Sequence, residues 1–342
     1  MRIGLMGATG MVGTEMLRIL EERNFPVDEL RPYASARSEG RKLPFAGGEV
    51  TCQVLTEKCF DGLDLVIVDV DDPIALEWAP IAAAAGAKVV DNSAAFRMDP
   101  DVPLVIAEVN PQDLRNMPKG IASCPNCTTM IPLTALAPLH KAARLDRMVV
   151  SSYQSVSGAG QAGSHELDAQ WTKLDGRMAD LSRAGTFDGY LVDGEQWPKP
   201  IAGNVIPLAG SVKEEGYTSE EWKMVRETRK IFHDDDIKCA VTCVRVPVYV
   251  GHAVSANLRF HRPMTKAEAV EILRDAPGVA LIDNGDGIPT PHDAAGIDPV
   301  LVGRIREDIS EPGSLNIWIT GDNLRKGAAL NAVQMAEVLL NQ

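Results

Sequence analysis

The stretch "RIGLMGATGMVG", residues 2–13, decides the fold. It reads as an apolar strand that runs into glycines spaced three residues apart, namely Gly7, Gly10 and Gly13. The following segment, "TEMLRILEER", has the apolar spacing of a helix. A strand, a glycine turn and a helix favour a dinucleotide site, because the turn admits a pyrophosphate and the helix N-terminus offers free N–H groups. A tight turn without a ligand is the alternative interpretation.

The chain continues to alternate strand-like and helix-like segments to about residue 125. "GLDLVIVDVD" reads as a buried strand, "IALEWAPIAAAAG" as a helix, and "AKVVDNSAAFR" as another strand and turn. This alternation predicts an α/β fold with a Rossmann-type, doubly wound parallel sheet. Longer strand-like runs such as "CAVTCVRVPVYVGHAVSANLRF" follow and predict a second, α+β domain with an antiparallel or mixed sheet.

The last segment, "RKGAALNAVQMAEVLLNQ", has the pattern of an amphipathic helix. We expect this helix to pack back on the first domain. The sequence therefore predicts a dinucleotide-binding domain over residues 1–127 plus 327–342, and a second domain over residues 128–326.

Composition limits the classes of function that need consideration. The formal net charge of −13 argues against a general nucleic-acid binder, although local arginines could still hold a small anion. No apolar run approaches the ~20 residues that span a bilayer. Six cysteines in 342 residues are too few for a disulfide scaffold. A strand that starts almost at the first residue leaves no room for a signal peptide, so we expect a cytoplasmic protein.

The end of the second strand indicates which nicotinamide cofactor is preferred. An NAD site usually places an acidic residue there, but "LRPYASARSEG" has none at its tip. Ser35, Arg37 and Ser38 stand where a ribose 2′-phosphate would lie. Because arginine and hydroxyl groups suit a phosphate dianion, NADP is favoured over NAD. A solvated loop arginine is the alternative.

The stretch "SCPNCTT" holds two cysteines, Cys124 and Cys127, with two residues between them. A helix is predicted to begin close to Cys127, and a helix N-terminus lowers the pKa of a thiol, as a cysteine nucleophile requires. A structural pair and a redox dithiol remain alternatives. A zinc site is disfavoured because Cys239 and Cys243 lie mid-strand, with side chains ~13 Å apart; we expect no metal.

Five further candidate residues lie elsewhere in the chain. His252 follows Gly251 and is expected in a turn facing a cleft, although a structural histidine is the commoner case. Arg245, near a strand end, could clamp a carboxylate. Glu220 and Lys223 share a helical face, by default as a surface pair. Arg97 follows a predicted parallel strand, at the edge where such sheets bind ligands.

Together these residues resemble a known family, the aspartate-β-semialdehyde dehydrogenases, over nearly the whole chain. The resemblance rests on "GATGMVG", "ASARSEGRKL", "DNSAAFRMDPDVPLVIAEVNP", "CPNCTT", "SYQSVSGAG", "NVIPLAG", "GYTSEEWKMVRETRKI", "CVRVPVYVGHA", "VGRIRED" and "DNLRKGAALNAVQMAE". It implies a reaction in which NADPH reduces L-aspartyl-4-phosphate to L-aspartate 4-semialdehyde through a cysteine thioester. It also implies a role in lysine, threonine, methionine and diaminopimelate biosynthesis, and a second domain that serves catalysis and dimerisation in a homodimer or homotetramer.

The resemblance assigns a role to each matching position. For catalysis it implies Cys127 as the nucleophile, Gln154 as the residue that orients the substrate, and His252 as the general acid/base. For the substrate it implies Arg245 at the α-carboxylate, Glu220 at the amino group, and Arg97 and Lys223 at the acyl phosphate and inorganic phosphate. For NADP it implies Gly7, Thr9, Gly10, Met11, Val12, Gly13, Ser35, Arg37, Ser38, Ser157, Gly158 and Gln334.

The sequence departs from the family pattern at two places. Cys124 stands where the family usually has an asparagine. "VDVDDP" replaces a Ser-Ala-Gly-Gly loop, so Asp69, Asp71 and Asp72 bring negative charge to the expected cofactor edge. The nearest rival is an N-acetyl-glutamyl-phosphate reductase, which would not need Glu220 for a free amino group. A non-catalytic paralogue would be expected to have lost at least one of the catalytic residues.

Overall fold

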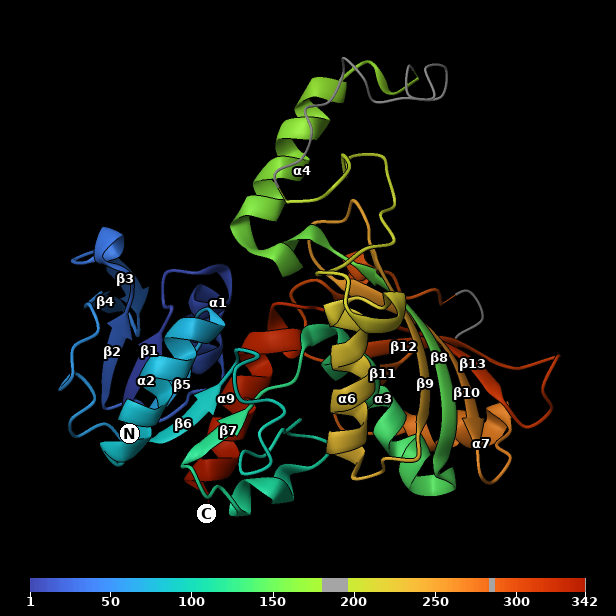
Figure 1. Cartoon of the computed structure of the whole chain (residues 1–342), viewed down its shortest axis with the longest axis horizontal. Coiled ribbons are helices and arrows are strands. Elements are labelled where there is room, and N and C mark those ends of the chain that lie inside the picture. Colours follow the sequence, from blue (N-terminus) through green and yellow to red (C-terminus); the bar gives the residue numbers. More distant parts are fainter. Residues whose placement is uncertain (180–195, 283–286, 342) are drawn as a thin grey trace.

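The structure, a computed structural model, describes residues 1–179, 196–282 and 287–341 (Figure 1). Their strands form a five-stranded sheet, a six-stranded sheet and a small two-stranded hairpin. The expected second domain at 128–326 includes residues 180–195 and 283–286, which lie outside the described residues. Among the described helices, none has the length and apolar composition needed to cross a membrane.

The first sheet is entirely parallel, with strand order β2-β1-β5-β6-β7. Its strands are β1 (Arg2–Met6), β2 (Glu29–Tyr33), β5 (Leu65–Val68), β6 (Lys88–Asp91) and β7 (Ile121–Ser123). The helices α1 (Met11–Glu22), α2 (Asp72–Ala84) and α9 (Leu330–Leu340) pack against it. The hairpin β3 (Lys42–Phe45) and β4 (Gly48–Thr51) lies beside β2.

Helices cover both faces of this sheet. Ile3, Leu5 and Ile67 share a core cluster with residues of α1 and α9. Val66 and Val68 flank Ile67 in β5, and their side chains share a separate cluster with residues of α2. All four residues of β5 are fully buried, which explains the continuous apolar run in its sequence. The predicted doubly wound parallel sheet is confirmed.

Two positions in the glycine turn after β1 have no room for a side chain. Gly7 has a φ of +81°, and a Cβ there would lie 1.9 Å from the Asp69 carbonyl oxygen. A Cβ on Gly13 would lie 2.2 Å from the Gly7 carbonyl oxygen. The turn therefore packs against the end of β5 on one side and against the start of α1 on the other, with no room for side chains.

The second sheet is mixed, with strand order β11-β12-β13-β10-β8-β9. Its strands are β8 (Leu145–Gln154), β9 (Lys238–Arg245), β10 (His252–Phe260), β11 (Val279–Leu281), β12 (Val300–Glu307) and β13 (Leu315–Gly321). The other α-helices of the described residues are α3 (Cys127–Ala143), α4 (Gly160–Leu174), α6 (Ser219–Phe232), α7 (Lys266–Arg274) and α8 (Pro291–Ala294). Short 3-10 or π segments are η1 (Ala36–Ser38), η2 (Pro111–Arg115), η3 (Val156–Ala159), η4 (Glu214–Gly216) and η5 (Arg325–Ala329). The predicted second α+β unit with a mixed sheet is confirmed.

Helix α3 connects the two sheets. It begins shortly after β7, the last strand of the first sheet, and then packs on β8, β10, β12 and β13 of the second. Figure 1 shows α3, α6 and α9 in the middle of the molecule, whereas α4 projects from it. At the end of the chain α9 packs on α1 and β6. The domain boundaries at 127/128 and 326/327 remain predictions.

The glycine turn gives a stability prediction. Gly13→Ala should lower the free energy of unfolding by about 1–3 kcal/mol, because its methyl group would overlap the Gly7 carbonyl. Gly48→Ala is the matched control, since the nearest atom to a Cβ there is 3.8 Å away, and it should change stability by less than about 0.5 kcal/mol. Urea unfolding measures both. Equal stability of the two variants would contradict the packing of the turn.

Candidate functional site

A cavity of about 860 Å³ lies where the glycine turn meets the start of α3. Its lining comes from segments that connect the strands of both sheets, from the turn before α1 to η5. Among the residues predicted for the site, Gly10, Met11, Val12, Arg37, Arg97, Cys127, Ser157 and Gly158 are in its lining. The candidate nucleophile and the candidate cofactor turn therefore open into one space.

The cofactor end of the cavity fits a pyrophosphate. Gly10 is the N-cap of α1 and makes no side-chain cap, and no acidic residue lies in the first turn of the helix. The helix N-terminus thus keeps its positive end for an external anion. Arg37 adds a cation to the same lining. Ser35 is the N-cap of η1, and neither it nor Ser38 is among the lining residues.

The departure noted at "VDVDDP" lies in the same cavity, because Asp69 and Asp71 line it. Asn92 donates a hydrogen bond to Asp69 over 2.8 Å. Burial raises the pKa of Asp69 to about 6, with this hydrogen bond acting against the shift. The carboxylate therefore gains its charge in the pH range near neutrality and faces the cofactor side of the cavity.

Cys127 is the first residue of α3, as predicted. The N-cap is Asn126, whose side-chain oxygen accepts a hydrogen bond from the Thr128 N–H over 2.9 Å. The thiol sulfur lies 3.4 Å from His252 Nε2. A Cβ on Gly327 would lie 2.9 Å from Cys127 Cβ, so the C-terminal segment closes directly over the nucleophile.

The pKa of Cys127 differs from the expectation. Burial raises the pKa of this thiol, and the Glu220 charge adds to the shift, while Arg245, Thr128 and Arg97 act in the opposite direction. The prediction of a lowered pKa is wrong, because desolvation of the thiolate, together with the Glu220 charge, outweighs Arg245, Thr128 and Arg97. The reactive form is a minor thiolate fraction at neutral pH.

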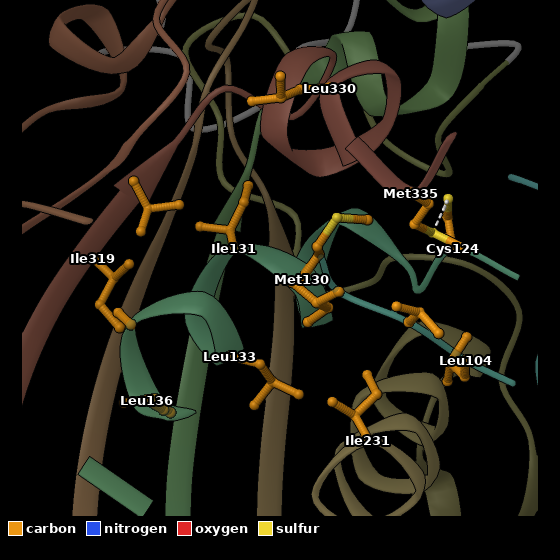
Figure 2. Packing of buried hydrophobic residues seen from close by; sticks show 14 of the residues in the cluster. Leu104, Cys124, Met130, Ile131, Leu133, Leu136, Ile231, Ile319, Leu330 and Met335 are labelled. Atoms are coloured by element: carbon orange, nitrogen blue, oxygen red, sulfur yellow. Dashed lines mark hydrogen bonds between the residues drawn. The ribbon is translucent and has the colours of Figure 1, made fainter. Parts of the chain in front are cut away.

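Cys124 has different surroundings. It is fully buried, is absent from the cavity lining, and lies 3.5 Å from the Met335 sulfur (Figure 2). Burial raises its pKa to about 12. All six cysteines are free thiols. The two cysteines of "SCPNCTT" therefore face different environments, one a core and the other a cavity.

His252 begins β10 and is fully buried, so the expectation of a turn position is wrong. The Ser155 backbone N–H donates to its Nδ1 over 3.1 Å. Because that N–H can only donate, the neutral ring carries its proton on Nε2, facing Cys127. Burial, and then Arg245, lower the pKa of His252 to about 3, so the imidazole is neutral at physiological pH.

The pairing of β8 with β9 places two more predicted site residues, Gln154 and Arg245, side by side. β8 and β9 pair Gln154 with Arg245, the last residues of their strands. Gln154 donates to Thr128 Oγ1 over 2.8 Å. Arg245 Nη1 donates to the Ser155 carbonyl over 2.7 Å, and its buried Nε has no partner among the described residues. An unpaired guanidinium nitrogen of this kind can receive a carboxylate.

Gly158 separates this cluster from the cofactor side. A Cβ there would lie 2.9 Å from Arg245 Nη1 and 3.3 Å from His252 Nε2. Only a glycine lets the backbone pass this close to both side chains.

An anion-binding corner lies next to the main cavity. Lys223 and Glu220 form an ion pair over 2.7 Å, and the Glu220 side chain is only 13% exposed, so this is not the default surface pair. Arg97 is buried and lines both the main cavity and a second cavity of about 250 Å³, which Lys223 also lines. The two cations therefore meet in one pocket beside the nucleophile.

Some predicted residues are not brought to the cavity. Gln334 is hydrogen-bonded to Lys326 and Glu108 and is absent from the lining. Gly7, Thr9 and Gly13 are likewise absent from it.

No group of three or more His, Cys, Asp or Glu side chains in the described part of the chain is arranged to hold a metal ion.

Two residues of the site were missed in the sequence. Asn323 accepts hydrogen bonds from the Gly251 N–H and from Ser155 Oγ, at 2.8 and 2.9 Å, and so supports the histidine cluster. Asn126 caps the nucleophile helix, and the preference of asparagine for N-caps could have identified it.

Comparisons with known proteins agree with this geometry. Residues 2–117 match the family described as semialdehyde dehydrogenase, NAD binding domain, and residues 136–326 match the semialdehyde dehydrogenase dimerisation domain. The chain is 48% identical to the aspartate-semialdehyde dehydrogenase of Streptomyces akiyoshiensis, over 99% of this chain and 98% of that one. It is 47% identical to the enzyme of the same name from Aquifex aeolicus, over 100% and 98%.

Solved structures give the same result. Aspartate semialdehyde dehydrogenase II of Vibrio cholerae, complexed with ASA, has a TM-score of 0.94 and 42% identity, covering 100% of this chain and 98% of that one. The Candida albicans aspartate semialdehyde dehydrogenase with NADP, at 23% identity and a TM-score of 0.73, covers 99% and 98% and shares the fold.

The thiol environments give a labelling prediction. Iodoacetamide should alkylate Cys127 before Cys124, with a rate that rises with pH and a midpoint above the ordinary thiol value of 9.0, because burial disfavours the thiolate. Peptide mass spectrometry after timed labelling at several pH values measures both rates. A midpoint below the ordinary value, or faster labelling of Cys124, would contradict this description.

Proposed function

We propose that this chain, which belongs to the aspartate-semialdehyde dehydrogenase family, reduces L-aspartyl-4-phosphate to L-aspartate 4-semialdehyde with NADPH, releasing phosphate. The family resemblance drawn from the sequence is confirmed, and the protein is an oxidoreductase of amino-acid biosynthesis. The observation that carries the specific reaction is the 3.4 Å contact between Cys127 Sγ and His252 Nε2, beside a cavity shared with the glycine turn.

The first half of the proposed reaction transfers the acyl group to Cys127. The thiolate attacks the acyl carbon, a carbon–sulfur bond forms, and the carbon–oxygen bond to phosphate breaks. Arg97 and Lys223 line the pocket beside the thiol, where they would hold the charge of the departing phosphate. The product of this half is a thioester on Cys127.

The second half uses His252 as a hydrogen-bond donor. NADPH, when bound, supplies the hydride that reduces the thioester carbonyl. The neutral imidazole holds its Nε2–H towards Cys127, so it can donate a hydrogen bond, without losing the proton, to the oxygen that becomes negative on the same carbon. Collapse of this oxygen to a carbonyl then expels the Cys127 thiolate and frees the semialdehyde.

Two groups of opposite charge would hold the substrate. Arg245, with its unpartnered Nε, would bind the α-carboxylate, and Glu220 would bind the amino group. Gln154, fixed by Thr128, would orient the reacting acyl group. Of the two readings, Glu220 favours aspartyl phosphate over N-acetyl-glutamyl phosphate, because an acetylated nitrogen carries no positive charge to pair with a carboxylate.

NADP is the proposed cofactor. The uncapped start of α1 would hold its pyrophosphate, and Arg37 its 2′-phosphate, while Ser157 and Gly158, which line the same cavity, would lie near its nicotinamide. The roles of Ser35, Ser38, Thr9 and Gln334 remain predictions.

Other proposals concern the setting of the reaction. We propose that the product enters the pathways that lead to lysine, threonine, methionine and diaminopimelate. The chain carries a dimerisation domain, and we propose a homodimer or homotetramer. The cytoplasmic location remains a prediction.

The function is tested by phosphate-dependent reduction of NADP with aspartate semialdehyde, alongside N-acetylglutamate semialdehyde and NAD as comparators. We expect turnover with aspartate semialdehyde and NADP. Cys127→Ala should lower kcat by a factor of about 10⁴ or more, since the nucleophile is lost. Cys124→Asn is the matched control and should stay active. No turnover of aspartate semialdehyde by the wild type, or equal loss in both variants, would contradict the proposal.

The role of Arg245 is tested by replacing it with lysine. Because lysine cannot reproduce a two-pronged guanidinium contact with a carboxylate, Arg245→Lys should raise KM for aspartate semialdehyde by about 10- to 100-fold. The measurement is steady-state kinetics with each substrate varied in turn, in which KM for phosphate should change little. An unchanged KM for the semialdehyde would remove Arg245 from the carboxylate site.

A further inference from the structure

Glu227 of α6 is a buried carboxylate to which the proposed mechanism gives no role. Its side chain is 1% exposed. Arg97 Nη1 donates to its Oε1 over 3.2 Å, and the Asn126 backbone N–H donates to its Oε2 over 2.8 Å. Arg97 belongs to the loop after β6, and Asn126 is the N-cap of the nucleophile helix. One carboxylate therefore joins the anion-binding arginine to the start of the helix that carries Cys127.

Glu227 lies on the face of α6 that contacts the Arg97 loop and the start of α3. Glu220, Lys223, Glu227 and Lys230 follow one another at helical spacings of three and four residues. Lys230 donates from Nζ to the carbonyls of Arg97, Asp99 and Val102, at 2.7, 2.7 and 2.8 Å. The backbone of the Arg97 loop is thus held by Lys230, and the guanidinium at its end is held by Glu227.

The remaining contacts of Arg97 show what this arrangement leaves free. Its Nε donates to the Ser93 carbonyl and its Nη2 to the Asn92 carbonyl, at 2.9 and 3.0 Å. With one bond from each terminal nitrogen, both nitrogens keep an N–H for a further acceptor. Among the described residues, Glu227 is the only carboxylate that forms an ion pair with Arg97, and it balances the charge of a buried guanidinium.

We propose that Glu227 is a positioning residue, whose carboxylate fixes the Arg97 guanidinium relative to the start of α3 so that phosphate leaving the acyl carbon at Cys127 meets Arg97. This inference rests on the proposed function. Glu227 itself touches neither reacting atom in this account. It acts through Arg97, so its loss should weaken the binding of phosphate more than the binding of the semialdehyde.

The test is Glu227→Gln, assayed in the direction that consumes phosphate. Both partners of Glu227 are donors, and an amide has a single oxygen, so glutamine can satisfy only one of them. We expect KM for inorganic phosphate to rise about tenfold or more, with KM for aspartate semialdehyde changed less than about twofold.

Glu221→Gln is the matched control. Glu221 lies on the same helix, is also buried, and accepts two backbone N–H groups, those of Thr218 and Cys243, at 2.7 and 2.9 Å. Its replacement leaves an orphaned donor in the same way but involves no arginine of the site. Glu221→Gln should therefore leave KM for phosphate within about twofold of the wild type. Equal phosphate KM values for the two variants would overturn the inference.

Two more variants separate positioning from a general loss of structure. In an Arg97→Ala background, Glu227→Gln should have no further effect on KM for phosphate, because its partner is gone; an undiminished effect would overturn the inference. If Glu227→Gln does not fold, Glu227→Asp keeps the charge on a stem too short to reach both donors. It should also raise KM for phosphate, and a wild-type value would overturn the inference. A wild type without phosphate-dependent activity would instead overturn the proposed function.

Discussion

The start of helix α3 is the constraint on which the rest of the structure depends. α3 begins at Cys127, four residues after β7 ends at Ser123, and its body packs on the second sheet. The thiol is therefore placed at the carboxyl edge of the parallel sheet, where the glycine turn binds nucleotides in such folds. It also comes within 3.4 Å of His252, the first residue of β10. One short connection thus puts the nucleophile between the cofactor cavity and the strand ends of the second sheet.

Buried charge is the second feature that organises the site. Arg97 is paired with Glu227, Lys223 with Glu220, and the Arg245 guanidinium keeps an unpartnered Nε. Burial raises the pKa of Cys127 and lowers that of His252, so both groups are neutral at rest. The thiol and the imidazole therefore add no net charge to the site. Arg245 alone has no carboxylate paired with it among these three cations, and the α-carboxylate of the substrate would supply that counter-charge.

The sequence predicts the parallel sheet and the helix start at Cys127 because both have local signals. These are an apolar run before spaced glycines, and Thr128, Thr129 and Pro132 in what reads as the first turn of a helix. It could not predict that Cys127 has a raised pKa, since burial depends on Gly327 and on strands far along the chain. His252 was expected in a turn because Gly251 precedes it, but strand pairing with β8 and β13 extends β10 to include it. Glu227 has no local signal, because its two partners lie 130 and 101 residues away.

The central claim is that Cys127 carries the acyl group during the reaction. Its most direct test is to mix the protein with aspartate semialdehyde and NADP in the absence of phosphate, then quench and map the peptides by mass spectrometry. Without phosphate the thioester cannot be released by phosphorolysis, so we expect one aspartyl group on the peptide at Cys127, formed together with a burst of NADPH. A burst without an adduct at Cys127, or an adduct at Cys124, would contradict it.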